Sequence, residues 1–194
     1  MNIHIGELPH PALTGQRFEA AILWHVLEHS SEPAELLKEV QNLLVPGGVL
    51  LVGVPNFGSL EARSSTSGWF HLDVPRHLVH FTRDSLINMM EGAGYEIVTW
   101  FRFAPEFDLF SFVQSALNKV GLPANHLYRM LRGRGAKLPG ARVLWWHRPL
   151  TLGLALPLTL VGLVWIPIAA LMGEGSSLGF LVRKSTGVHD AQKG

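Results

Sequence analysis

Histidines grouped with carboxyl side chains are the residues of this sequence with the most evident chemistry. The chain has 194 residues and ten histidines. His25 is followed at short spacing by Glu28 and His29, and a second group places Asp73 near His77. Because a histidine changes its charge near neutral pH, His25 or His77 can act as a general base toward a hydroxyl group.

Both groups also have structural interpretations. His25, Glu28 and His29 have a spacing that offers nitrogen, oxygen and nitrogen ligands to a metal ion. Glu28 and His29 can instead satisfy backbone groups at the start of a helix; we favour this interpretation and predict no metal site. Asp73 and His77 either face an acceptor pocket or hold their own loop, with Asp73 paired to a nearby arginine, and the sequence leaves both open.

Alternating strand and helix signals surround these residues. The apolar run 18–24 has strand length, and Pro33 suits the first turn of a helix that ends at the Pro-Gly-Gly of residues 46–48. Residues 49–54 are nearly all apolar, as in a strand buried on both faces of a parallel sheet. His25 therefore follows a strand directly, at the edge where open α/β sheets bind ligands.

A second strand and helix unit follows along the chain. A loop rich in Ser and Gly, residues 55–81, carries His71, His77 and His80. A helix capped by Thr82 and a β-rich segment at 95–103 come next. Together these elements predict an α/β fold with a largely parallel sheet.

The segment FEAAILWHVLEHSSEPAELLKEVQNLLVPGGVLLVGVPN resembles the middle of class I S-adenosylmethionine-dependent methyltransferases. The shared motifs are Val26-Leu27-Glu28-His29, Glu32-Pro33, Leu44-Val45-Pro46-Gly47-Gly48 and Val54-Pro55-Asn56. The later segment GWFHLDVPRHLVHFTRDSLINMMEGAGYEIV resembles the subgroup of ubiquinone-type O-methyltransferases. The resemblance covers about residues 1–103 and implies a partial Rossmann-like methyltransferase sheet.

The resemblance implies methyl transfer from S-adenosylmethionine to a hydroxyl of a small or lipid-linked acceptor. His77, His25 and Asp73 are then the catalytic candidates, with a histidine removing the proton of the hydroxyl. The implied cofactor contacts are Gly6, Glu7, Leu8, Trp24 and His25. By this resemblance residues 1–5 are the remainder of the family's third strand, and the next three form the turn along the adenine.

The family's glycine-rich cofactor loop has no counterpart before Phe18. Only 17 residues precede Phe18, too few for two strand and helix units, so the chain resembles the C-terminal part of a methyltransferase. We therefore expect the isolated chain to bind S-adenosylmethionine weakly or not at all. The family's sheet order would also leave residues 19–24 as an apolar edge, which suits a missing N-terminal half or a dimer partner.

Charge divides the chain into two unlike parts. Residues 1–108 hold 6 basic and 13 acidic side chains, whereas residues 109–194 hold 10 basic and 2 acidic ones. Residues 149–173 carry no charge and are long enough for a membrane span of about 20 residues, although Pro157 and Pro167 interrupt them. This basic and apolar part suits the surface of an anionic membrane.

The end of the chain limits how this apolar segment can lie. Residues 178–184 resemble the family's final strand, which inserts antiparallel into the same sheet, so one full crossing would leave that strand on the wrong side of a membrane. We favour an in-plane membrane anchor; helices packed on the sheet, or a dimer contact, are the alternative. The expected regions are a methyltransferase-like part (1–108), a basic and apolar helical insertion (109–175), and a final strand with a tail (176–194).

Composition and motifs argue against several other classes of protein. The chain has no cysteine, which excludes disulfides, zinc thiolate sites and thiol nucleophiles. It shows no module for binding nucleic acid. We predict a methyltransferase, truncated relative to its family, that is cytoplasmic and peripheral on the inner face of the membrane. The alternatives are a non-catalytic membrane-associated remnant or binding module, and a protein with a single membrane span.

Overall fold

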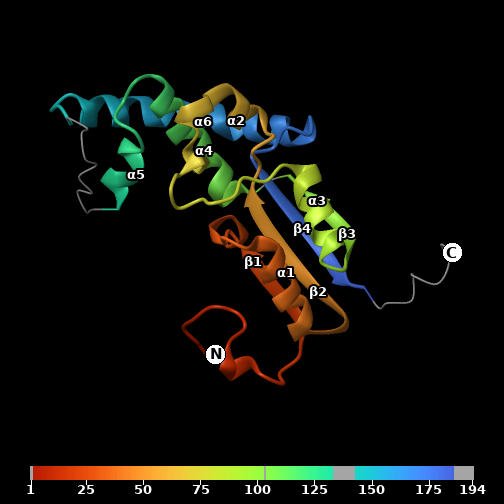
Figure 1. Cartoon of the computed structure of the whole chain (residues 1–194). Helices are drawn as coiled ribbons and strands as arrows, with labels where there is room; N and C mark the ends of the chain where they lie inside the picture. Colours follow the sequence, from red (N-terminus) through yellow and green to blue (C-terminus); the bar gives the residue numbers. More distant parts are fainter. Residues whose placement is uncertain (1, 103, 133–142, 186–194) are drawn as a thin grey trace.

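The computed structural model describes residues 2–102, 104–132 and 143–185 of the chain (Figure 1). Its strands and helices, in chain order, are β1 (Phe18–Trp24), α1 (Pro33–Leu43), β2 (Leu44–Pro55), α2 (Leu60–Ser65), α3 (Arg83–Gly92), β3 (Tyr95–Phe101), α4 (Pro105–Lys119), α5 (His126–Leu131), α6 (His147–Leu171) and β4 (Ser177–Lys184). Short 3-10 turns lie at Pro11–Leu13, Leu27–His29, Thr66–Gly68 and Phe70–Leu72.

The described strands form one sheet in the order β1-β2-β4-β3. β1 pairs with β2 in parallel, and β4 runs antiparallel to both β2 and β3. Three strands therefore share one direction and the last strand opposes them. This arrangement confirms the predicted α/β fold and the predicted antiparallel insertion of the final strand.

The main core lies between one face of the sheet and helices α1 and α3. Leu37 of α1 and Leu86 of α3 are fully buried there against Val52 of β2 and Phe180 of β4. Thr82 caps α3 through a reciprocal pair of hydrogen bonds with Ser85. The alternation of buried and exposed positions along the strands directs their apolar side chains toward these helices.

The opposite face of the sheet is sparsely covered. Ile22 is 66% exposed on it. One row across all four strands pairs Trp24 with Gly53, Gly53 with Gly179, and Gly179 with Phe101. The aromatic rings of the two outer strands lie over the two central glycines and stack at 6.0 Å. A side chain at either glycine would displace a ring, so the glycines allow the rings to lie flat on the sheet.

The N-terminal stretch differs from its prediction. Residues 2–17 contain no strand, so the expectation that residues 1–5 keep a strand is wrong for the described residues 2–5. Ile3 and Ile5 are 74% and 94% exposed. A strand needs a neighbouring strand for its backbone groups, and residues 2–5 have none among the described strands.

The region predicted as an apolar and basic insertion folds as α4, α5 and α6. α6 is one continuous helix of 25 residues, so Pro157 and Pro167 do not break it. Both prolines lie on its exposed side, away from the positions of the helix that pack against the protein. α4 and α6 lie together across the end of the sheet at which β1 and β2 finish (Figure 1). A small second core between them includes Val113, Leu117 and Leu158.

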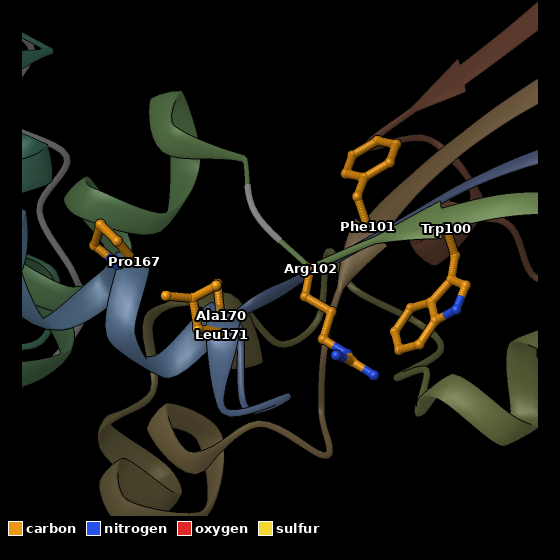
Figure 2. A pocket seen from close by; sticks show the side chains of 6 residues that line it. All are labelled: Trp100, Phe101, Arg102, Pro167, Ala170 and Leu171. Atoms are coloured by element: carbon orange, nitrogen blue, oxygen red, sulfur yellow. The ribbon is translucent and has the colours of Figure 1, made fainter.

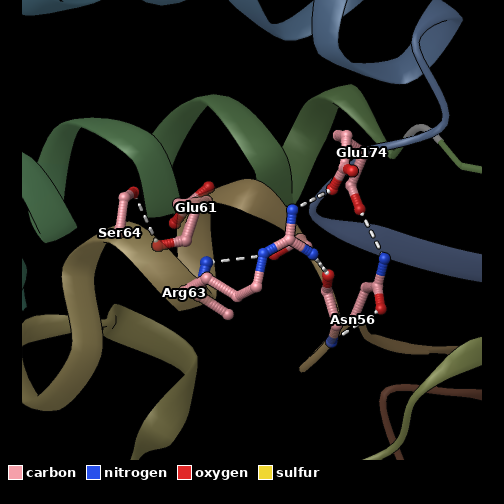
Figure 3. Close-up of polar contacts among 9 residues, drawn as sticks. Asn56, Glu61, Arg63, Ser64 and Glu174 are labelled. Atoms are coloured by element: carbon pink, nitrogen blue, oxygen red, sulfur yellow. Dashed lines mark hydrogen bonds and ion pairs between the residues drawn. The ribbon is translucent and has the colours of Figure 1, made fainter.

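Polar contacts tie this helical region to the sheet. The carboxyl group of Glu61 accepts hydrogen bonds from Ser111 at 2.5 Å, from Ser115 at 2.9 Å and from Ser176 at 2.6 Å. Figure 3 shows Arg63, on the same helix α2, reaching Glu174 at 2.8 Å. Glu61 therefore links α2, α4 and the residue before β4.

Replacing Glu61 with Ala should destabilise the protein by roughly 2–4 kcal/mol, because three serine hydroxyls would lose their acceptor. Urea unfolding of the variant and the wild type measures this loss.

Burial raises the pKa of the Glu61 carboxyl above its ordinary value, although the hydrogen bonds from the serine hydroxyls lower it. The folded state thus favours the protonated acid. Compared with Glu61→Gln, the wild type should lose unfolding free energy as the pH rises from about 4.5 through that raised pKa. Urea unfolding of the wild type and Glu61→Gln across this pH range measures the difference in their free energies of unfolding. A difference that does not change with pH would contradict the prediction.

Candidate functional site

A cavity of about 340 Å³ lies next to the turn that follows β1. Its polar lining comes from that turn and from the loop before α3, and its aromatic lining comes from the same loop and from α4 and α5. The lining residues are His25, Glu28, His29, Phe70, His71, Asp73, Arg76, His77, Phe107, Phe110 and Tyr128. The cavity therefore has a polar part formed by histidines and acids and an aromatic wall.

Local backbone geometry places the first polar group. His25 adopts a left-handed conformation (φ 52°) directly after β1, and its backbone N–H donates to the Gly53 carbonyl at 2.8 Å. The chain then enters the 3-10 turn at Leu27–His29. The backbone N–H groups of Leu78 and Val79 donate to the Glu28 carbonyl, which fixes the histidine-rich loop onto this turn.

Hydrogen bonds orient the imidazole rings. His29 Nδ1 bonds the Arg76 carbonyl at 2.9 Å, and His77 Nδ1 bonds the His71 carbonyl at 2.6 Å. A carbonyl oxygen only accepts, so Nδ1 of both rings carries a proton and Nε2 of each neutral ring keeps a free lone pair. His25 Nδ1 bonds a Glu28 carboxylate oxygen at 3.1 Å.

Burial keeps the inner histidines uncharged. Desolvation, together with repulsion from His25 and His77 when these rings are protonated, lowers the pKa of His71 to about 3. Burial also lowers the pKa of His77, which is 8% exposed. At neutral pH His77 is therefore an unprotonated base. Among the residues that line the cavity, three buried polar atoms have no hydrogen-bond partner: His25 Nε2, Glu28 Oε2 and His71 Nε2.

Asp73 both holds its own loop and faces the cavity, so the two alternatives left open by the sequence occur together. It forms an ion pair with Arg76, and its backbone carbonyl accepts from the N–H groups of Arg76 and His77. It also lines the cavity. The loop is thus held by Asp73 with His77 buried beneath it, and the same residues face the cavity.

The structure brings together some of the residues predicted from the sequence and separates others. His25, Asp73 and His77 share the cavity, and the ring of Trp24 lies edge-on to His25 at 6.0 Å. Leu8 instead lines a separate hollow with Glu39 and Asn42, near the end of α1. Gly6 and Glu7 belong to the same stretch before β1, and Figure 1 shows this stretch at the end of the sheet opposite the turn after β1. This structure therefore forms no shared cofactor pocket from Gly6, Glu7 and Leu8 with Trp24 and His25.

Sequence reasoning did not assign the aromatic wall to the site. Phe107 and Phe110 come from α4 and Tyr128 from α5, and the ring of Phe107 lies 4.0 Å from that of His25. An apolar helical face was visible in this part of the sequence. Nothing in its spacing, however, shows which turn of the sheet the helices will meet.

Three residues could hold a divalent cation. The ligand atoms of Glu28, His29 and His77 lie within 4.8 Å of one another. The two histidines are oriented by carbonyl groups in the manner common for metal ligands. The Glu28 side chain bonds the His25 ring. It therefore does not have the alternative role of satisfying backbone groups at the start of a helix. The absence of a metal site stays a prediction.

Comparisons with known proteins concern the class of the domain and not the individual site residues. Residues 5–99 match the model of a family described as a methyltransferase domain. The matched segment contains His25, Asp73 and His77, and it ends before α4. The match supports the predicted enzyme class and S-adenosylmethionine as its cofactor. A search of curated protein sequences found no significant match.

Solved structures similar to this chain include the [4+2]-cyclase SpnF, at 20% identity and a TM-score of 0.47, covering 93% of this chain and 53% of SpnF. A methyltransferase from Thermotoga maritima has 15% identity and a TM-score of 0.45, with 88% and 57% covered. One from Archaeoglobus fulgidus has 15% identity and a TM-score of 0.45, with 89% and 63% covered. The chain thus spans little more than half the length of these proteins.

His71 should make the stability of the protein sensitive to acid. Its folded pKa of about 3 lies below the ordinary value of 6.5, so its stabilising contribution is present above pH 6.5 and is lost as the pH falls toward 3. The loss should approach about 1.4 kcal/mol per pH unit. His71→Phe keeps a ring and removes this proton site, so it should flatten the dependence between pH 6.5 and pH 5. Equal pH dependence of both proteins in urea unfolding would rule this out.

Proposed function

We propose that the histidine cavity is the acceptor side of an S-adenosylmethionine-dependent methyltransferase that acts on a hydroxyl group. The observation that carries the proposal is the set of unpartnered polar atoms on His25, Glu28 and His71 at one cavity. Buried polar groups rarely stay unpaired in native proteins. A hydroxyl-bearing acceptor would satisfy them, and the aromatic wall suits an acceptor with an apolar part.

His77 is the residue we assign as the general base. Its Nε2 carries a lone pair, and its lowered pKa keeps it unprotonated at neutral pH. It would take the proton of the hydroxyl as the acceptor oxygen bonds to the methyl group and the bond between that methyl group and the donor sulfur breaks. Asp73 is a positioning residue, because its backbone carbonyl holds the N–H of His77. His25 would donate or accept a hydrogen bond toward the acceptor.

The described residues do not by themselves complete a site for S-adenosylmethionine. When bound, the cofactor supplies the methyl group that is transferred. Trp24 and His25 lie at the carboxyl end of β1, where they could contact it, but Leu8 and its neighbours lie elsewhere. We propose that a glycine-rich strand and loop from a further segment or a partner pairs with the free edge of β1.

We also propose that the protein belongs to the ubiquinone-type subgroup of O-methyltransferases and that its acceptor is small or lipid-linked.

The test is methyl transfer by the completed domain. The chain would be joined to, or co-expressed with, a segment that supplies a glycine-rich strand and loop. Transfer from tritiated S-adenosylmethionine would be assayed on catechol and on a lipid extract. His77→Phe should lower kcat about 100-fold, whereas His80→Gln, which does not line the cavity, should keep most activity. Because a metal on His77 would block its role as a base, activity should also survive EDTA. Full activity of His77→Phe, or dependence on a metal, would contradict the proposal.

A further inference from the structure

α6 presents a continuous apolar stripe to solvent. Apolar residues on its outward side recur every three or four positions from end to end: Leu152 (56% exposed), Leu156 (68%), Leu160 (59%), Val164 (65%), Ile168 (42%) and Leu171 (88%). Within the most apolar window of the helix only 17% of residues are buried. An exposed apolar surface of this extent marks an interaction site in a soluble protein.

The other side of α6 is fixed to the protein along its length. Gly162 allows close contact with Leu109 and Phe112 of α4, and Thr151 is hydrogen-bonded to His126 of α5 at 2.8 Å. Only five residues separate the end of α6 from β4, which lies between β2 and β3. A crossing orientation would carry α4, with its buried Gln114, into hydrocarbon. An orientation parallel to the membrane plane keeps every one of these contacts.

Exposed cations and tryptophans lie at the N-terminal end of α6. Trp145 is 86% exposed, and Arg132, Arg148 and Lys119 are exposed nearby in the helical region. The sequence from 109 to 173 has no acidic residue. Tryptophan and basic side chains favour the headgroup layer of a bilayer, so the charges around the apolar stripe complement an anionic lipid surface.

A second basic and aromatic group lies at the other end of α6. A cavity of about 380 Å³ opens between the end of β3 and the last turns of α6, lined by Trp100, Phe101, Arg102, Pro167, Ala170 and Leu171 (Figure 2). The Arg102 guanidinium lies 3.6 Å from the Trp100 ring centre, and that of Arg83 lies 4.3 Å from it.

The charges at this cavity favour an anion. Arg102 makes no ion pair among the described residues, and no acidic residue lines the cavity. Arg83 lies 3.5 Å from Asp84, and Glu174 pairs with Arg63. Arg102 itself lines the cavity, and guanidinium groups bind phosphate well. The exposed Leu171 beside them would contact an acyl chain.

We propose that α6 lies flat on an anionic lipid bilayer, with its outward stripe among the acyl chains. The phosphate of one anionic lipid binds Arg102 in the cavity at the end of the helix. This binding site does not depend on the proposed catalytic function, and it would hold the acceptor cavity close to a membrane.

Vesicle flotation of the whole chain tests the proposal. The protein should float with vesicles of phosphatidylcholine and phosphatidylglycerol, and at least tenfold less with phosphatidylcholine alone. The double variant Leu160→Asp, Val164→Asp should lose binding. Ile22→Asp, an equally exposed apolar residue on the sheet, should not. Circular dichroism of each variant checks that it is folded.

A separate set of variants tests the phosphate site. Arg102→Ala should weaken binding to anionic vesicles by about fivefold, whereas Arg17→Ala, an exposed cation remote from α6, should leave it unchanged. Binding that is equal on both kinds of vesicle, or unchanged in Arg102→Ala, would overturn the phosphate site. Failure to float, with a stable dimer in sedimentation, would overturn membrane docking. Retention in the pellet after alkaline carbonate extraction would overturn the flat orientation.

Discussion

The pairing of β4 between β2 and β3 determines where the other parts of the molecule lie. β4 is formed by the last described residues, and its Leu178, Phe180 and Val182 are buried in the main core. The chain must therefore leave the sheet after β3 and return to its centre. α4, α5 and α6 fill that excursion and lie across the end of the sheet where β1 and β2 finish. Their aromatic side chains reach the histidine cavity for this reason, and Asp108 of α4 accepts a hydrogen bond from Ser177 at the start of β4.

Local sequence patterns predicted the parts of the fold that local physics decides. β1 was expected over 18–24 and is found there, because apolar residues and a following turn suffice to define a strand. β2 begins at Leu44 rather than at 49, since Gly47 takes a left-handed conformation within the strand instead of ending the helix. The expected strand at 1–5 required a partner strand, which composition and periodicity do not reveal.

The site was predictable only in part for the same reason. His25 follows β1, and His77 lies in a loop at the same edge, so topology alone brings them together. Phe107 and Tyr128 belong to helices whose position depends on the return of the chain to β4, and no local pattern states that position. The charge division has a related explanation: the acidic part of the sequence contains the sheet strands β1 to β3, whereas the basic part contains the helices around an apolar stripe.

The central claim is that this chain supplies the acceptor side of a methyltransferase and leaves the cofactor side to another segment. Isothermal titration calorimetry of the purified chain with S-adenosylmethionine tests it most directly, because the claim requires that Trp24 and His25 alone do not hold the cofactor. We predict no binding in the micromolar range. Micromolar binding to the isolated chain would contradict the claim, since it would require a complete cofactor site within these residues.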